Sequence, residues 1–145
     1  MTDITFYTLT DTAQQAEVLF VVKLITKKLY PKHRIWVCAP QAVCERLSAL
    51  LWTANDNQSF IAHALAGTPE ALHSTIVLGA VESAITPNEQ WHDVLINMSD
   101  TVPEYFSQFE RCVEMVAGDE NHKVLGRERF RFYKERGYTI THHKI

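Results

Sequence analysis

The length, composition and charge of the chain are those of one ordinary folded domain. Its 145 residues are 46% hydrophobic and 21% charged, which excludes a wholly disordered protein and suits a single core, so we expect one α/β domain over residues 1–145. The formal net charge of −3 argues against a general polyanion binder. A site for nucleic acid or for an acidic peptide would therefore have to come from a local basic cluster.

The cysteines and the N-terminus predict a cytoplasmic protein. The three cysteines, Cys38, Cys44 and Cys112, are odd in number and none has C-x-x-C spacing, which argues against a disulfide framework. The first residues have no basic region before an apolar run, and the apolar stretches are far shorter than the ~20 residues of a membrane span. We therefore expect neither a signal peptide nor contact with a membrane.

The first half of the chain alternates between short apolar runs and apolar residues at helical spacing. This pattern predicts a strand at 4–9, a helix that begins at a Thr12–Gln15 capping box and ends at Pro31, a strand at 34–39, and a helix from Pro40 to about Trp52. A polar turn is expected at 53–58.

The second half continues the alternation and suggests the fold. It predicts strands at 75–78 and 93–98, a helix from Asp100 or Thr101 to Gly118 with the apolar stripe Phe106, Phe109, Val113 and Val116, a helix at 123–136 stopped by Gly137, and a strand at 138–142. The strands are apolar on both faces, as in a parallel sheet that helices cover on each side. We expect an α/β fold with a three-layer, Rossmann-like, mostly parallel sheet flanked by helices.

The sequence lacks the glycines that a nucleotide site of this fold class needs. The turn after the first strand, Thr8 to Thr12, has no glycine and contains Asp11, which would repel a phosphate. The five glycines of the chain form neither a G-x-G pair nor a P-loop. We therefore predict no nucleotide-binding glycine loop and no cofactor.

The histidines do not form a recognisable metal or catalytic site. Apart from the neighbours His142 and His143, which would point to opposite faces of a strand, the seven histidines are scattered. No zinc spacing and no H-E-x-x-H motif occurs, and no G-x-S-x-G motif accompanies His92 and Asp93. We predict no bound metal and a protein without catalytic residues.

The last helix carries a basic stripe with an aromatic ring at its centre. At about 100° per residue, one third of the helix circumference gathers Lys123, Arg127, Phe130, Arg131 and Lys134. Leu125 and Phe132 would then point towards the core. The stripe could be a solvated face on which Glu128 pairs with neighbouring cations. The embedded ring of Phe130 is less usual on such a face, and together with the cations it suits a ligand that has both an apolar ring and negative charge.

Two large aromatic residues, Trp52 and Phe60, flank the polar segment in the middle of the chain. They could fill the core, or they could be exposed and anchor a partner, since large aromatic side chains dominate interface energetics.

The order of these landmarks resembles the chi subunit family of bacterial DNA polymerase III, a clamp-loader accessory protein. The matching pieces are Thr5 to Tyr7, Leu51-Trp52, Ser59 to His63, Leu65 to Gly67, Asp93 to Asn97, Phe106 with Phe109, Arg127 to Tyr133, and Gly137-Tyr138. Phe130 stands where a tyrosine is expected in this family, and His142 where a small hydroxyl residue is expected.

The resemblance implies a non-catalytic adaptor with two protein partners. One is the psi subunit, which tethers chi to the clamp loader, and its surface would include Trp52 and Phe60. The other is the acidic C-terminal tail of single-stranded DNA-binding protein (SSB), which ends in a phenylalanine with a free carboxylate. The tail site would comprise Lys123, Arg127, Phe130, Arg131 and Val116, and DNA would be reached only through SSB.

The alternative is direct binding of single-stranded nucleic acid by the last helix. Phe130, Phe132 and Tyr133 would then stack on bases. The net charge and the acids beside the stripe weigh against this reading.

Overall fold

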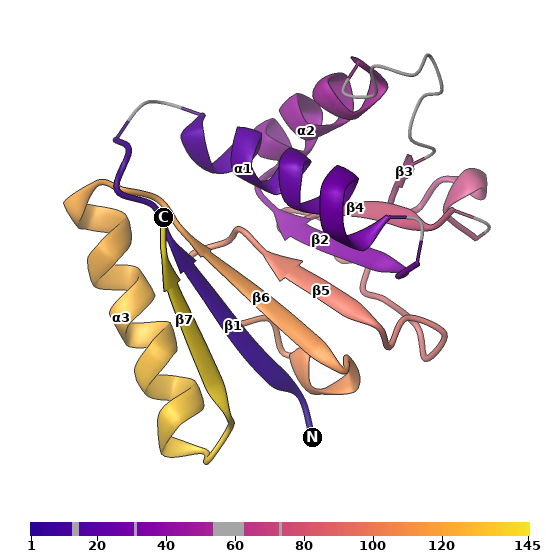
Figure 1. Ribbon diagram of the computed structural model, residues 1–145. Helices are drawn as coiled ribbons and strands as arrows, with labels where there is room; N and C mark the ends of the chain where they lie inside the picture. Colours follow the sequence, from indigo (N-terminus) through magenta and orange to yellow (C-terminus); the bar gives the residue numbers. More distant parts are fainter. Residues whose placement is uncertain (13–14, 31, 54–62, 73) are drawn as a thin grey trace.

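The computed structural model describes residues 1–12, 15–30, 32–53, 63–72 and 74–145. The described residues form a seven-stranded sheet in the order β3-β4-β2-β5-β6-β1-β7, and every neighbouring pair of strands runs parallel (Figure 1). The strands are β1 (Asp3–Thr8), β2 (Ile35–Ala39), β3 (His63–Leu65), β4 (Ile76–Ala80), β5 (Val94–Asn97), β6 (Arg111–Val116) and β7 (Ile140–Lys144).

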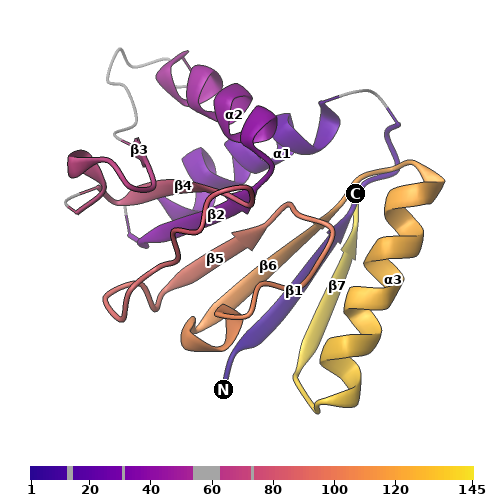
Figure 2. The same cartoon turned by 180° about the vertical axis from the view of Figure 1, so that it is seen from behind.

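Helices cover both faces of the sheet, which confirms the three-layer α/β fold expected from the sequence. One face carries α1 (Ala16–Leu24), its π-helical continuation η1 (Ile25–Leu29) and α2 (Gln41–Thr53). The other carries α3 (Glu120–Glu135) and the short 3-10 turn η3 (Phe106–Gln108), while a second 3-10 turn, η2 (Pro69–Leu72), follows β3. Figures 1 and 2 show α3 on its own beside β7 and β1, at the opposite end of the sheet from α2.

Two predicted helices differ from those in the structure. The α1 helix begins at Ala16 with Gln15 as its N-cap in a left-handed conformation (φ 98°) and without a side-chain capping bond, so the predicted Thr12–Gln15 capping box is wrong. It ends, with η1, at Leu29; Pro31 and most of the predicted turn at 53–58 lie outside the described residues.

The predicted helix from Asp100 to Gly118 is also wrong. Only η3 is helical there, and Arg111–Val116 forms β6, which lies between β1 and β5 in the sheet. Apolar residues three and four apart fit a helix, but a short run of this kind cannot be told from a buried strand by spacing alone. Residues 111–116 form a strand because they pair with β1 on one side and with β5 on the other.

Alternation along β6 and β1 sorts their side chains between the two layers. Val113 and Met115 join the cluster under α1 and α2, whereas Cys112, Glu114 and Val116 face α3. In β1, Ile4 and Phe6 likewise face α3. The pairing of β1 with β6 thus places residues that lie far apart in the chain beneath one helix.

Candidate functional site

A buried carboxylate fixes the position of α3 on the sheet. Glu114 in β6 has no exposed surface, and its oxygens accept hydrogen bonds from Arg129 Nε (2.8 Å), from Asn97 Nδ2 (3.0 Å to each oxygen) and from the Tyr133 hydroxyl. Burial raises the pKa of this carboxyl, and the neighbouring Arg129 guanidinium opposes that rise. Burial and the adjacent Glu114 carboxylate raise the pKa of Tyr133 far above its ordinary value.

The guanidinium of Arg129 also ties α3 to the loop that follows β5. Its Nη1 donates to the carbonyl of Asp100 (3.2 Å) and its Nη2 to the carbonyl of Met115 (3.2 Å). A charge this buried is tolerated because it is paired and hydrogen-bonded. Directional bonds therefore hold the helix in one register over β5 and β6.

The first turn of α3 is capped by a short local network. Asp119 is the N-cap, and its carboxylate accepts hydrogen bonds from the backbone N–H of His122 (3.2 Å) and pairs with His122 Nδ1 (2.6 Å). The hydrogen bond from His122 lowers the pKa of Asp119. This cap fixes where the helix begins, one turn before Lys123 and two before Arg127.

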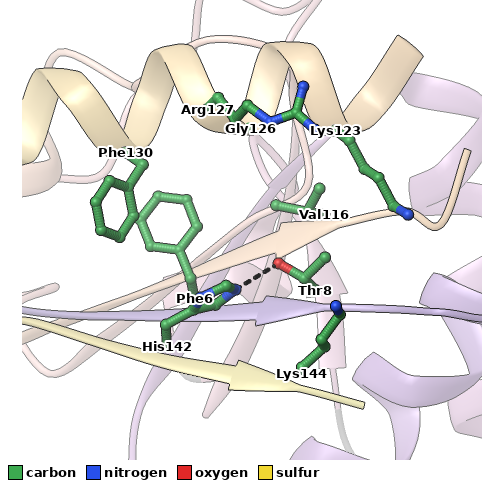
Figure 3. Close-up of a pocket in the computed structure, with 9 residues that line it drawn as sticks. All are labelled: Phe6, Thr8, Val116, Lys123, Gly126, Arg127, Phe130, His142 and Lys144. Atoms are coloured by element: carbon green, nitrogen blue, oxygen red, sulfur yellow. Dashed lines mark hydrogen bonds between the residues drawn. The ribbon is translucent and has the colours of Figure 1, made fainter. Parts of the chain in front are cut away.

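A pocket of about 420 Å³ opens between α3 and the carboxyl ends of β1, β6 and β7 (Figure 3). Its apolar part is made by Phe6, Val116 and Phe130. Its rim is cationic and polar, and is formed by Lys123 and Arg127 from the helix, Thr8 from β1, and His142 and Lys144 from β7. The arrangement suits a ligand with an apolar ring and one or more carboxylates.

The aromatic end of the pocket is held rigid by its own contacts. The rings of Phe6 and Phe130 meet edge to face with centroids 5.4 Å apart, and the His142 ring lies 6.3 Å from that of Phe130. Thr8 Oγ1 and His142 Nε2 share a hydrogen bond of 2.8 Å, drawn as a dashed line in Figure 3. The wall that would receive an apolar ring is therefore formed before any ligand arrives.

Gly126 lets α3 approach β6 closely at the back of the pocket. A Cβ at this position would lie 2.8 Å from Cγ2 of Val116, closer than side-chain atoms pack. A glycine costs a helix interior about 1 kcal/mol relative to alanine. Here that cost permits the close contact of helix and strand that shapes the pocket.

Arg127 is available to a carboxylate ligand. Its side chain is 64% exposed, and its ion pair with Glu120, with 3.7 Å between Nη1 and Oε1, joins two solvent-exposed groups. Such surface pairs contribute at most about 1 kcal/mol. An incoming carboxylate can therefore replace Glu120 at the guanidinium.

The structure brings together four of the five residues predicted for the tail site. The pocket is lined by Val116, Lys123, Arg127 and Phe130. The fifth residue, Arg131, is exposed on α3 outside the lining. Sequence reasoning missed Phe6, Thr8, Gly126, His142 and Lys144. Alternation along the first and last strands could have grouped four of these five, but only the pairing of β1 with β7 puts them beside α3.

The face of α3 that packs on the sheet differs from the predicted one. The buried positions are Gly126, Arg129 and Tyr133, while Leu125 and Phe132 are only partly buried. Phe132 is covered by the guanidinium of Arg136, 3.6 Å from the ring centre. With Tyr133 fully buried, the three rings required for stacking on nucleic-acid bases do not share an exposed surface.

Of the second predicted surface, the structure describes Trp52, which lies at the other end of the sheet. Trp52, near the end of α2, is 55% exposed, as the partner-anchor interpretation requires. Helix α2 contacts β4 and β3, the strands farthest from β7 in the sheet order. Phe60 lies outside the described residues.

Comparison with known proteins identifies the family. The profile described as "DNA polymerase III chi subunit, HolC" matches residues 1–141. The chain belongs to this family. Similar proteins named DNA polymerase III subunit chi occur in Pseudomonas aeruginosa (28% identity over all of this chain and 98% of the relative) and in Escherichia coli (24% identity over 75% of this chain and 71% of the relative). Another is that of Haemophilus influenzae (24% identity over 72% of this chain and 69% of the relative).

Membership of the chi family assigns the chain to DNA replication, as a subunit of the DNA polymerase III complex. Within the described residues, no group of histidine, cysteine and acidic side chains could hold a metal ion. No described helix is both long and apolar enough to cross a membrane.

Proposed function

We propose that this chi-family protein is a non-catalytic adaptor that links the clamp loader, through a psi subunit, to the acidic C-terminal tail of SSB. The observation that carries the proposal is the α3 pocket, which combines a preformed aromatic wall with three cationic side chains at its mouth. A peptide that ends in phenylalanine supplies the two matching features, an apolar ring and a terminal carboxylate.

In the proposed complex, the ring of the terminal phenylalanine packs against Phe130, Phe6 and Val116. Arg127 binds the terminal carboxylate in bidentate fashion, for which a guanidinium is suited. Lys123 and Arg131 attract the acidic residues before it, Arg131 from outside the pocket. Such a small interface binds modestly and weakens with salt. Many tails on one SSB-coated strand would then raise the effective concentration.

Fluorescence anisotropy of a labelled acidic peptide ending in Asp-Phe-Pro-Phe tests this site. We expect saturable, salt-sensitive binding that is lost when the terminal phenylalanine is removed. Arg127→Ala and Phe130→Ala should each weaken binding by about tenfold or more, as expected for central contacts. Arg131→Ala should weaken it less, because this side chain lies outside the pocket lining.

Lys134→Ala is the matched control, because Lys134 is an exposed cation on the same helix that does not line the pocket. It should leave the affinity unchanged. The tail assignment is wrong if the peptide does not bind at roughly 100 µM protein, where even a weak complex should register. It is also wrong if Phe130→Ala binds as tightly as the unchanged protein.

The psi surface has a separate test. We propose that Trp52, at the opposite end of the sheet from the tail pocket, anchors psi together with Phe60. Trp52→Ala should weaken psi binding by at least thirtyfold in calorimetric titration, a typical loss for an aromatic hot spot, and should leave the tail affinity unchanged. An unaltered psi affinity would place the psi contact elsewhere.

A further inference from the structure

A second groove, of about 520 Å³, lies against edge strand β7 beside the face covered by α1. Tyr7 of β1 and Phe20 of α1 form its apolar wall. Residues 142–145, which are the end of β7 and the residue that follows it, line the groove over four successive positions. Lys23, Lys27 and Lys28 line its helical side. Neither the proposed tail pocket nor the proposed psi surface uses these lysines.

The charged side chains that line this groove are of one sign. With Lys144 it has four lysines, and no aspartate or glutamate side chain lines it among the described residues. Lys23, Lys27 and Lys28 are exposed and follow one another on the continuous α1–η1 helix. In a chain of net charge −3, this cluster is a local concentration of positive charge.

The aromatic wall is already packed. The Tyr7 ring lies 5.1 Å from that of Phe20 and stacks on His143 at 5.1 Å with an interplanar angle of 20°. Tyr7 and Phe20 are half-buried against the core cluster under α1. These rings support an extended chain laid across them, but they do not project as separate platforms for successive bases.

The groove adjoins the α3 pocket across strand β7, because His142 and Lys144 line both. It also follows the free edge of the described sheet, since β7 is the last strand in the order. Backbone bonds to β1 involve Thr139 and Ile145, so the N–H and C=O groups of His142 and Lys144 point to the outer edge. An extended peptide could hydrogen-bond to them as an added strand.

We propose that this groove binds acidic residues that precede the C-terminal tip of the peptide held in the α3 pocket. This inference rests on the proposed tail-binding function and extends it to a second contact region. The chain of the ligand would pass from the pocket over β7 and present its carboxylates to Lys23, Lys27 and Lys28. A nucleic-acid ligand fits less well, since it lacks the backbone amides that an edge strand pairs with.

Three peptides separate the two contacts in anisotropy or calorimetric titrations. The first is the C-terminal tip, Asp-Phe-Pro-Phe, alone. The second is this tip preceded by about six residues rich in aspartate, and the third is the tip preceded by about six neutral Ser and Gly residues. We expect the acidic extension to tighten binding by about tenfold, as the sum of several exposed ion pairs. The neutral extension should bind like the tip.

The Lys27→Glu/Lys28→Glu variant should abolish the gain from the acidic extension and bind the tip with unchanged affinity. The matched control, Lys32→Glu/Lys134→Glu, carries the same change in net charge at exposed lysines outside both grooves, and should retain most of the gain. This control separates a local contact from long-range attraction.

The possible failures are distinct. If the tip does not bind, the proposed tail-binding function fails and this inference fails with it. If the tip binds but the acidic extension adds nothing, or if both double variants lose the gain equally, the groove is not a peptide contact and the tail pocket stands. The Lys27→Glu/Lys28→Glu change could instead weaken the binding of a single-stranded oligonucleotide and leave the affinity for the acidic peptide unchanged. In that case the groove binds nucleic acid and the inference is overturned.

Discussion

The two faces of the sheet are packed by different means. Beneath α1 and α2, the buried cluster of described residues is aliphatic, with Cys44 and Met115 as its sulfur-containing members. Beneath α3, the cluster is rich in aromatic rings, and it surrounds the Glu114–Arg129 ion pair. Apolar burial is non-directional, so it stabilises the first face without selecting one helix position. The hydrogen bonds of the second face select one, and the candidate pocket lies there.

The largest expected effect comes from breaking the buried pair. Arg129→Met leaves the Glu114 carboxylate buried without its cation, which should lower the free energy of unfolding by about 3–5 kcal/mol. Urea titration measures this change. Because Arg129 also bonds to the carbonyls of Asp100 and Met115, the tail peptide should bind the folded fraction more weakly.

The Glu114→Gln/Arg129→Met variant is the control for this prediction, because it removes both charges and should recover much of the lost stability.

The loss of stability in Arg129→Met should also depend on pH. Burial already raises the pKa of Glu114, and without Arg129 it rises further. A raised folded-state pKa favours folding at low pH, and this benefit is lost as pH rises through that pKa. The loss of unfolding free energy in Arg129→Met should therefore be smaller at about pH 4.5 than at about pH 8. A loss that does not depend on pH would contradict the ion-pair explanation.

A comparable loss on the aliphatic face should leave binding intact. Leu47 of α2 is fully buried, and Leu47→Ala should cost about 3 kcal/mol through lost burial and a cavity. Because the tail pocket is formed by α3, β1, β6 and β7, the affinity of the folded protein for the tail peptide should not change. Calorimetric titration under conditions where the variant is fully folded checks this. A weaker complex would show that the two faces are coupled.

The sequence predicted the aliphatic face better than the face beneath α3. Helical spacing of apolar residues identified α1 and α2, because one side of each helix is buried. Continuous apolar runs identified β2, β4 and β5, because both faces of these strands are buried. On the α3 face, helical spacing left Arg129 outside the predicted basic stripe. Glu114 stood within a run predicted to be helical. Their pairing depends on β6 lying beside β5 and β1, which no local pattern contains.

The residues of the candidate site also fall into a group that sequence patterns could predict and a group that they could not. Lys123, Arg127 and Phe130 share one helix, so spacing alone could group them. Phe6 and His142 stand more than a hundred residues apart, and the parallel pairing of β1 with β7 brings them together in register. Sequence patterns thus found the part of the pocket that is local in the chain. The part supplied by strand pairing required the folded structure.

The smallest expected effect on stability tests the close contact of α3 with β6. Gly126→Ala improves helix propensity by about 1 kcal/mol, but its Cβ would lie 2.8 Å from Val116 Cγ2. Overpacking of this kind costs about 1–3 kcal/mol, so the net loss should be about 1 kcal/mol. To accommodate the methyl group, α3 must move away from Val116, and the pocket between them changes shape. We therefore expect tail affinity to fall several-fold although the free energy of unfolding falls by only about 1 kcal/mol.

Gly137→Ala makes the same chemical change just beyond the other end of α3. There the backbone has a positive φ of 80° and no atom lies within 4 Å of the added Cβ, so the change strains a turn without crowding the pocket. It should cost about 1 kcal/mol, the typical penalty for alanine at such a position, and leave tail affinity unaltered. If both alanines weaken the tail complex equally, the peptide responds to the general stability of α3. If only Gly126→Ala does, the spacing between α3 and β6 sets the affinity, and the directional bonds of Glu114 and Arg129 matter to function because they maintain that spacing.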